Sequence, residues 1–551
     1  MSRPVFLIVL LFTLLLGRVV LGAAQPQDSI DGEWVGAFEL GEDLVYVRVQ
    51  FKTEAQGIKL TVISMTPGTP GTVADARLEW NRIHFELSGT PEKLVFEGEL
   101  QGNDVRGAVG RAGKRGTFQL VRTAQVDPKV YDQYAGAYEL ERDKIIFIRR
   151  RDVLKEDPPY SMARSWLYYL DESGRMGILY PSSETSFFSG PTYAVPVPVE
   201  LRVRFIRDRG GHVNGLVWHK SDLPEMFAKR SKLYREEEVH FANRDIAFAG
   251  RLLVPATKGP HPAVVLATGW RATNRNSPLD ALADVLARHG IAALVYDKRG
   301  TGASGGDWRK SSFLRSLADD VLAALQYLRS RKDINPGQVG VFGSSWTAVV
   351  TSLAASRSKD VAFMIIVSAP GLSLGERYLM GLERYLRANG FSEEDIRDAV
   401  AFANLEVEFS RTGEGWEKLE AAADRVRTRK WFSHTWTVTL GAGSKDHWFW
   451  REQRRSSVDD HPVSLLKKVT CPVLAVYGES DSLVPPADNK ALVEKGLREG
   501  GNKDYTIKMF PKGEHGLWQV EASGAAGAKT YVSGYLETMT EWLIKRVDVP
   551  R

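Results

Sequence analysis

The pattern of apolar residues changes after Glu236, and this change constrains the fold most. From there on, short apolar runs without alternation are separated by longer helical stretches. Strands buried on both faces of a parallel sheet have such runs, and each crossover to the next strand is usually a helix. We expect strands at 263–266, 291–296, 339–342, 363–367, 473–477 and 505–510. We expect helices at 279–288, 313–330, 346–356, 488–499 and 529–545. This series predicts an α/β domain with a doubly wound, mostly parallel sheet over residues 233–551.

The series is interrupted once, over about residues 370–468. This insertion is charged, aromatic and helical in its pattern. A segment of that length needs structure of its own, so we expect a helical cap over the sheet. Its ring-bearing side chains either line a pocket or, in the favoured interpretation, pack the cap itself. These residues are Trp416, Trp431, Trp436, His447, Trp448, Phe449 and Trp450.

Two β-rich segments precede the α/β domain. Residues 25–126 contain alternating runs separated by Gly, Pro and Asn, which predicts an all-β module. A second β-rich module is expected over 127–232, and its stretch 134–140 echoes residues 34–40, which indicates an internal repeat. Aromatic residues of these modules either pack between strands, which we favour, or line a ligand- or glycan-binding cup. They are Trp34, Tyr46, Trp166 and Tyr168.

Length and composition exclude several classes of protein. A chain of 551 residues exceeds one domain at roughly 150 residues each. With 43% hydrophobic and 26% charged residues, it is neither disordered nor a polytopic membrane protein. The net charge of +5 is small and both signs are interspersed, so no nucleic-acid partner is expected. The single cysteine, Cys471, excludes an intramolecular disulfide and a thiolate zinc site, and its place at the start of a buried strand indicates an inert thiol.

The N-terminus has the three zones of a secretory signal peptide. Arg3 precedes an apolar stretch over residues 5–16, and small residues stand at Gly22, Ala23 and Ala24. We expect cleavage after Ala24 and export to the periplasm or the extracellular medium. An uncleaved anchor is disfavoured because the apolar stretch falls short of the ~20 residues that span a bilayer. We therefore expect no stable membrane insertion after cleavage.

Residues 343–347, Gly-Ser-Ser-Trp-Thr, stand between an apolar strand and a helix. This is the context of a nucleophile elbow, a sharp turn that lifts a serine out of the sheet. Ser345 is the central serine. Because a serine hydroxyl is a weak nucleophile unless a base takes its proton, the elbow needs partners.

Two later loops supply those partners. Asp481 follows the next-to-last strand, and His515, the one histidine beyond it, follows the last strand. Their order after Ser345 places a nucleophile, an orienting acid and a base at the same sheet edge. We expect His515 to accept the proton of Ser345 and Asp481 to fix the tautomer of His515. This chemistry requires neither a metal nor a cofactor.

An acyl-transfer site also needs donors for an oxyanion. The backbone N–H of Trp346 is one candidate, and the backbone N–H of Trp270, after the first parallel strand, is the other. Arg271 and Arg275 lie close to Trp270 and either steady an acidic substrate group or, in the favoured interpretation, are solvated. The pairs Glu376-Arg377 and Glu383-Arg384 are interpreted as a solvated helix face rather than a substrate anchor.

The stretch from about Glu236 to Arg551 resembles the α/β-hydrolase fold, in particular exported bacterial serine esterases with an N-terminal β-domain. The resemblance rests on the Asp-x-Arg-Gly-x-Gly-x-Ser loop at 297–304, the elbow, the Gly-x-x-Asp-x-x-Val-Pro segment at 478–485 and the late Gly-x-His. It implies hydrolysis of carboxylic esters through an acyl-enzyme on Ser345, without a cofactor. Asp297 and Arg299 would then support their loop. Thr268 and Thr347 stand where the family usually has His and Gly.

Two other functions stay open at this point. An exopeptidase of the prolyl-oligopeptidase type shares the triad, although the β region here is small for a propeller. A binding protein on a hydrolase scaffold is the third reading, because of Thr268 and Thr347. The favoured partner is a small-molecule ester, and the sequence makes no prediction of oligomeric state.

Overall fold

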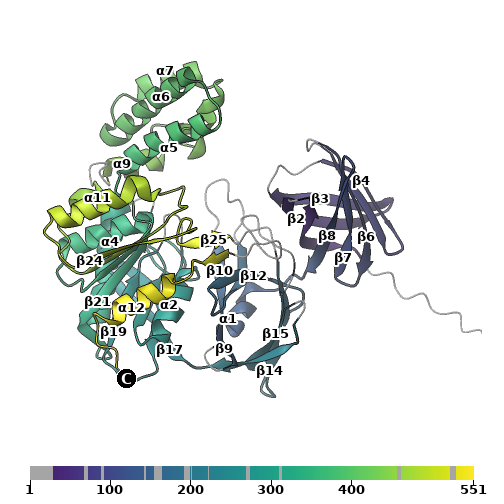
Figure 1. Ribbon diagram of the computed structural model, residues 1–551, viewed down its shortest axis with the longest axis horizontal. Coiled ribbons are helices and arrows are strands. Elements are labelled where there is room, and N and C mark those ends of the chain that lie inside the picture. The colour runs from purple at the N-terminus through teal and green to yellow at the C-terminus, as the bar shows by residue number, and fades with distance from the viewer. Residues whose placement is uncertain are drawn as a thin grey trace, which may run out of the picture.

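The computed structural model describes residues 29–41, 43–66, 72–88, 92–141, 144–153, 164–190, 199, 201–220, 223–268, 273–308, 313–455, 461–520 and 529–550. The predicted signal peptide and Trp270 lie outside these ranges. The described residues form three sheets (Figure 1).

The first module is an eight-stranded antiparallel sheet in the order β3-β2-β1-β8-β7-β6-β5-β4. Its strands are β1 (Gly32–Leu40), β2 (Asp43–Glu54), β3 (Gly57–Thr66), β4 (Thr72–Glu79), β5 (Arg82–Ser88), β6 (Leu94–Gln101), β7 (Asp104–Arg111) and β8 (Lys114–Thr123). Buried residues alternate with more exposed ones along β5, so one face of the sheet encloses an apolar core. There the rings of Phe85 and Phe96 stack with their centroids 4.4 Å apart.

The second module is a ten-stranded sheet in the order β11-β10-β9-β16-β15-β14-β13-β12-β26-β25, and a pairing of β11 with β12 closes its first eight strands into a barrel. The barrel strands are β9 (Gly136–Glu141), β10 (Lys144–Val153), β11 (Arg164–Leu170), β12 (Arg175–Pro181), β13 (Ser186–Ser189), β14 (Leu201–Arg207), β15 (Val213–Lys220) and β16 (Met226–Ser231). They are preceded by η1 (Pro128–Val130) and α1 (Tyr131–Tyr134).

The last two strands of this sheet, β25 (Trp518–Val520) and β26 (Lys529–Tyr531), come from the far end of the chain. β26 pairs with β12, placing Thr530 opposite Arg175. The helix predicted from residue 529 therefore starts too early. Residues 529–531 extend the barrel sheet, and α12 begins at Tyr535.

The third sheet has the order β17-β18-β20-β19-β21-β22-β23-β24, in which β19 to β24 run parallel. Its strands are β17 (Tyr234–Asn243), β18 (Ile246–Pro255), β19 (His261–Leu266), β20 (Ala292–Tyr296), β21 (Ile334–Ser344), β22 (Met364–Val367), β23 (Val473–Gly478) and β24 (Tyr505–Phe510). α3 (Phe313–Arg329), α4 (Trp346–Arg357) and α11 (Pro486–Glu499) share one apolar core with the sheet, and α2 (Leu279–Arg288) and α12 (Tyr535–Ile544) share another. The six predicted strands are present.

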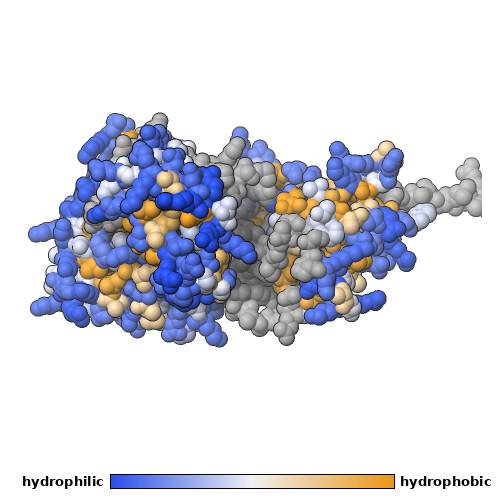
Figure 2. All heavy atoms as spheres, turned by 90° about the horizontal axis from the view of Figure 1, so that it is seen from above, coloured by the Kyte–Doolittle hydropathy of each residue, from blue (hydrophilic) through white to orange (hydrophobic). Residues whose placement is uncertain are grey.

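The segment between β22 and β23, which we call the cap, stands above the carboxyl ends of the parallel strands (Figure 1). It contains α5 (Leu374–Ala388), α6 (Glu393–Thr412), α7 (Trp416–Val426), η2 (Lys430–His434), α8 (Trp436–Thr439), α9 (Trp448–Arg455) and α10 (Pro462–Leu466). Trp431, Trp436, Phe449 and Trp450 are buried in a core of the cap itself, so for these side chains packing is the correct interpretation. Seen from above, the cap presents mainly hydrophilic side chains, with apolar patches between them (Figure 2).

The proposed cup in the β modules is not supported by the structure. Trp34, Tyr46 and Tyr168 are buried in or between the sheets, and Trp166 lies under the guanidinium of Arg151. These rings pack between strands. Among the helices that the structure describes, none is long and apolar enough to cross a membrane.

Candidate active site

Ser345 stands at the turn between β21 and α4, with φ 56° and ψ −124°. A non-glycine residue in such a conformation is strained, and strained serines of this kind are found in nucleophile elbows. A Cβ atom on Gly343 would lie 2.4 Å from the carbonyl oxygen of Thr347, so only glycine fits two residues before the serine. The Ser345 N–H donates to the carbonyl of Val367 at the end of β22, at 2.7 Å.

Thr347 stabilises the elbow despite standing where glycine is usual. Its hydroxyl accepts from the N–H of Ser344 at 2.8 Å and donates to the carbonyl of Ser344 at 2.9 Å. The side chain is buried and points back onto the turn. The extra bulk is thus accommodated by two hydrogen bonds that a glycine could not make.

Asp481 and His515 form a hydrogen-bonded pair. His515 Nδ1 lies 3.1 and 3.0 Å from the two carboxylate oxygens of Asp481. Asp481 is buried, and it also accepts from the N–H groups of Leu483 and Val484. Burial raises the pKa of Asp481, but the hydrogen bond and charge of His515 outweigh this effect and hold the pKa below its ordinary value. An ionised Asp481 keeps the proton on Nδ1 and leaves Nε2 free to accept another.

The two loops that carry this pair touch each other. A Cβ atom on Gly478 would lie 2.2 Å from the carbonyl oxygen of Gly513, which shows how closely the chains approach. The N–H of Ser480 donates to the same carbonyl at 2.8 Å. The position of His515 relative to Asp481 is therefore fixed by backbone contacts as well as by the side chains.

Ser368 connects the elbow to this pair. It follows Val367, the residue bonded to Ser345, and its hydroxyl accepts from the N–H of Gly516 at 3.2 Å and bonds to Asp481. Ser368 is fully buried with φ 49°. The structure brings the three predicted residues to one edge of the sheet. It describes both Ser345 and His515 and has no direct hydrogen bond between them, a contact that commonly tightens only when substrate binds.

One predicted oxyanion donor can be placed. Trp346 is the first residue of α4, so its N–H belongs to a helix N-terminus, where partial positive charge favours an anion. Trp270 and Arg271 lie outside the described residues. Arg275 bonds to Asp297, Glu238 and the carbonyl of Gly250, so it supports the fold rather than a substrate.

Asp297 and Arg299 support the loop beside the elbow. Asp297 accepts from the N–H groups of Arg275 and Ala303, both at 2.8 Å. Arg299 donates to both oxygens of the buried Asp320 on α3, at 2.7 and 2.6 Å. A Cβ atom on Gly302 would lie 2.3 Å from Asp297, so this turn requires glycine.

The second module holds two of the active-site loops. Asp152 on β10 accepts from the side chains of Asn274 and Asn276, at 3.0 and 2.7 Å, in the loop after β19. Just after His515, Leu517 accepts from the N–H of Val532 at 2.9 Å, next to the β26 strand that extends the barrel. Neither Asp152 nor Ser368 was found from the sequence, because both act through neighbours that only the fold brings close.

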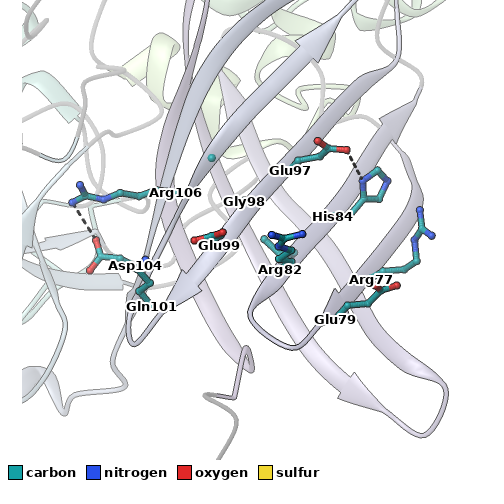
Figure 3. A pocket seen from close by; sticks show the side chains of 12 residues that line it. Arg77, Glu79, Arg82, His84, Glu97, Gly98, Glu99, Gln101, Asp104 and Arg106 are labelled. Carbon is teal, nitrogen blue, oxygen red and sulfur yellow. Dashed lines mark ion pairs between the residues drawn. The ribbon is translucent and has the colours of Figure 1, made fainter.

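A separate groove of about 920 Å³ lies on the outer face of the first module, across β4 to β7 (Figure 3). His84 faces Glu97 across 3.8 Å, and Arg106 faces Asp104 across 3.9 Å. Its side chains carry both signs of charge. The lining residues are Arg77, Glu79, Arg82, Ile83, His84, Glu97, Gly98, Glu99, Gln101, Asp104, Arg106 and Gly107. The groove holds no triad residue, and its charged lining is unlike an apolar acyl slot.

Comparisons with known proteins found similarity over the α/β part of the chain. The family described as X-Pro dipeptidyl-peptidase (S15 family) matches residues 246–501. Esterase EstD of Thermotoga maritima is 25% identical over 367 residues, which are 63% of this chain and 77% of EstD. Quorum-quenching protein AidA of Acinetobacter baumannii is 34% identical over 109 residues, 20% of this chain and 36% of that protein.

Among solved structures, the α/β hydrolase GrgF of Penicillium has 20% identity and a TM-score of 0.38, covering 57% of this chain and 99% of GrgF. An esterase of Pyrococcus furiosus has 14% identity and the same TM-score of 0.38, covering 57% of this chain and 91% of that chain. The resemblance to α/β-hydrolase serine esterases expected from the motifs is confirmed.

Proposed function

We propose that the protein hydrolyses carboxylic esters through an acyl-enzyme formed on Ser345. The observation that carries the proposal is the Asp481–His515 pair, held at the sheet edge that also presents the Ser345 elbow. The similarity to EstD, an esterase by name, supports the same reaction. Export through the predicted signal peptide is part of the proposal.

The reaction follows from the geometry of the three residues. Ser345 Oγ attacks the ester carbonyl while His515 Nε2 takes its proton, and Asp481 stabilises the imidazolium that forms. The oxyanion is held by the N–H of Trp346 and, by expectation, that of Trp270. His515 returns the proton to the leaving alcohol. Water then attacks the acyl-enzyme while His515 takes its proton, and His515 returns that proton to Ser345 Oγ as the acyl–Oγ bond breaks and the acid leaves.

A peptidase is the second candidate, because the matching family is described as a dipeptidyl-peptidase family. An enzyme of that type has to hold the free amine of its substrate, for which carboxylates are suited. Three of the cap carboxylates have other partners in this structure. Glu406 bonds to Thr437 inside the cap, Glu376 bonds to Ser373 and His461, and Glu383 pairs with Arg387. These contacts favour the esterase.

The direct test is labelling with a fluorophosphonate followed by peptide mapping. We expect one modified serine, Ser345. Ser345→Ala should lower kcat on an aryl ester by on the order of 10⁶, if the triad acts as a unit. Ser344→Ala is the matched control and should keep most activity. A label on another serine, or faster cleavage of alanyl and prolyl anilides than of every ester, would contradict the proposal.

A further inference from the structure

Arg377, in the first turn of α5, has an unusual environment. Its Nε is enclosed without a hydrogen-bond partner, and the guanidinium makes no ion pair with any residue that the structure describes. Of its guanidinium nitrogens only Nε is both fully enclosed and without a partner, and the residue as a whole is partly exposed. Burial lowers the pKa of Arg377 to about 10, which leaves it charged at neutral pH.

Four other enclosed arginines among the described residues have carboxylate partners. The pairs are Arg149–Glu236, Arg251–Asp280, Arg275–Asp297 and Arg299–Asp320. This is the expected arrangement, because a charge removed from water is costly unless an opposite charge compensates it. Arg377 departs from it. A partly buried fork of N–H donors without an acid of its own is suited to an acid that arrives with a ligand.

The position of Arg377 in the fold indicates that the ligand is a substrate of the candidate active site. α5 begins six residues after Ser368, which contacts Asp481 and the residue after His515. Leu374, one turn before Arg377, packs against the cap core and also against the core that contains Trp346.

Arg384, two turns further along the same face of α5, pairs with Asp488 in the first turn of α11. That helix follows the loop that carries Asp481. The face of α5 that carries Arg384, and by helix periodicity Arg377, therefore lies toward the N-terminus of α11, the helix that follows the acid loop.

We propose that Arg377 binds a carboxylate of the substrate, so that the preferred substrates are esters whose acyl or alcohol part carries a free carboxylate. This inference rests on the proposed esterase function and names its substrate class. The guanidinium offers two parallel N–H donors to the two carboxylate oxygens, a geometry that a lysine does not reproduce. On this proposal Arg377 is a substrate anchor, the alternative that the sequence analysis disfavoured for the Glu376-Arg377 pair.

The first test compares monoethyl adipate with ethyl hexanoate, which have the same acyl chain length and differ in the terminal carboxylate. For the wild-type protein we expect kcat/KM to favour the adipate by about tenfold to a hundredfold, the range of a charged hydrogen-bonded contact. Arg377→Met should bring the ratio close to one, and Arg377→Lys should restore only part of it. Arg384→Met is the matched control, because it removes an arginine from the same helix face, and it should leave the ratio unchanged.

A second measurement separates this inference from the esterase proposal. In the Ser345→Ala background, calorimetric titration with adipate should show binding that a further Arg377→Met change abolishes and Arg384→Met does not. If the wild-type protein hydrolyses no ester but adipate binding still depends on Arg377, the esterase proposal fails while the role of Arg377 as a carboxylate-binding residue stands. A wild-type preference for the neutral ester, or adipate binding that Arg377→Met leaves intact, would overturn the inference.

Discussion

Thr347 stands in the turn that presents Ser345, at a position where glycine is usual. The hydroxyl bridges the N–H and the carbonyl of Ser344, so it restrains the backbone just before the nucleophile. A methyl group in the same place keeps the volume but leaves both backbone groups with one partner fewer. The conformation of Ser345 then depends more heavily on its bond to Val367.

We therefore expect Thr347→Val to lower the free energy of unfolding by about 1–3 kcal/mol, the cost of unpaired buried polar groups. Labelling of Ser345 by a fluorophosphonate should slow as well. Thr540→Val is the control, since the hydroxyl of Thr540 bonds only within α12. Denaturant unfolding and labelling rates measure both effects. Equal rates for the two variants would show that Thr347 has no part in shaping the elbow.

Gly478 is a second residue whose size matters to the site. Because its Cβ would lie 2.2 Å from the Gly513 carbonyl, Gly478→Ala must push apart the loops that carry Asp481 and His515. We expect a fall in kcat of about a hundredfold, as for other small misplacements of reacting groups. Gly381→Ala, where the added methyl meets nothing within 4 Å, is the control. Steady-state kinetics on an aryl ester decides the question.

At this scale the sequence predicts candidate residues whose chemistry follows from local order: Ser345 after a strand, Asp481 and His515 after two later ones. It could not identify Ser368 or Asp152, because a serine or an aspartate in a loop has no local signature of what it contacts. It also treated Arg377 and Arg384 alike. Their difference arises from Asp488, which lies more than a hundred residues away in the chain and pairs with Arg384 alone.

Among the elements, the cap is held together by a buried carboxylate. Glu406 on α6 accepts from the hydroxyl of Tyr378 on α5 and, at 2.6 and 2.7 Å, from the N–H and hydroxyl of Thr437 on α8. Burial raises the pKa of Glu406 from its ordinary 4.5 to about 7. The folded cap therefore keeps a proton that the unfolded chain releases at lower pH.

The sign of the pH effect follows from proton counting. Between about pH 4.5 and pH 7 the unfolded chain binds fewer protons at this residue, so stability falls as pH rises, by about 3 kcal/mol in total. Glu406→Gln should remove this part of the pH dependence. Thermal unfolding followed by tryptophan fluorescence across this range measures it, with Glu408→Gln on the exposed side of the same helix as control. An unchanged pH profile in Glu406→Gln would contradict the assignment.

Asp152 connects the barrel of the second module to the loop after β19 through side-chain hydrogen bonds. We expect Asp152→Ala to lower kcat about tenfold to a hundredfold with a smaller change in KM, because the loop after β19 loses two of its side-chain anchors. Asp208→Ala is the matched control. Asp208 bonds to two backbone N–H groups in a turn of the same module, far from these loops in the sheet order. Equal kinetics in both variants would mean that the anchors do not matter for catalysis.

The strands of the parallel sheet were predictable because each is an uninterrupted apolar run, but β26 was not. Residues 529–531 include a lysine and a threonine, and their strand conformation depends on pairing with β12, more than 350 residues earlier in the chain. The local hydrophobic pattern of residues 529–531 therefore does not predict this strand. The closed barrel of β9 to β16 is likewise set by the pairing of β11 with β12 rather than by the pattern of either strand.

Over the whole molecule, the two β modules differ in how they relate to the α/β domain. The first module has a core of its own and meets the second through a small cluster of Val35, Tyr46, Val121 and Phe188 and through the ion pair Arg202–Asp104. The second module shares the core of α2 and α12. Phe147, Tyr168 and Leu170 belong to that core together with Leu517, the second residue after His515.

This difference predicts unequal effects of truncation. A protein that begins at residue 126 should fold and keep kcat/KM on an aryl ester within about threefold, since it loses none of the contacts that position the triad. A protein that begins at residue 233 exposes the face of α2 and α12 that the barrel covers, and it lacks the partner of β26. We expect it to be insoluble or inactive. Soluble expression, thermal unfolding and labelling of Ser345 distinguish the cases, and full activity of the shorter protein would show that the barrel is dispensable for the active site.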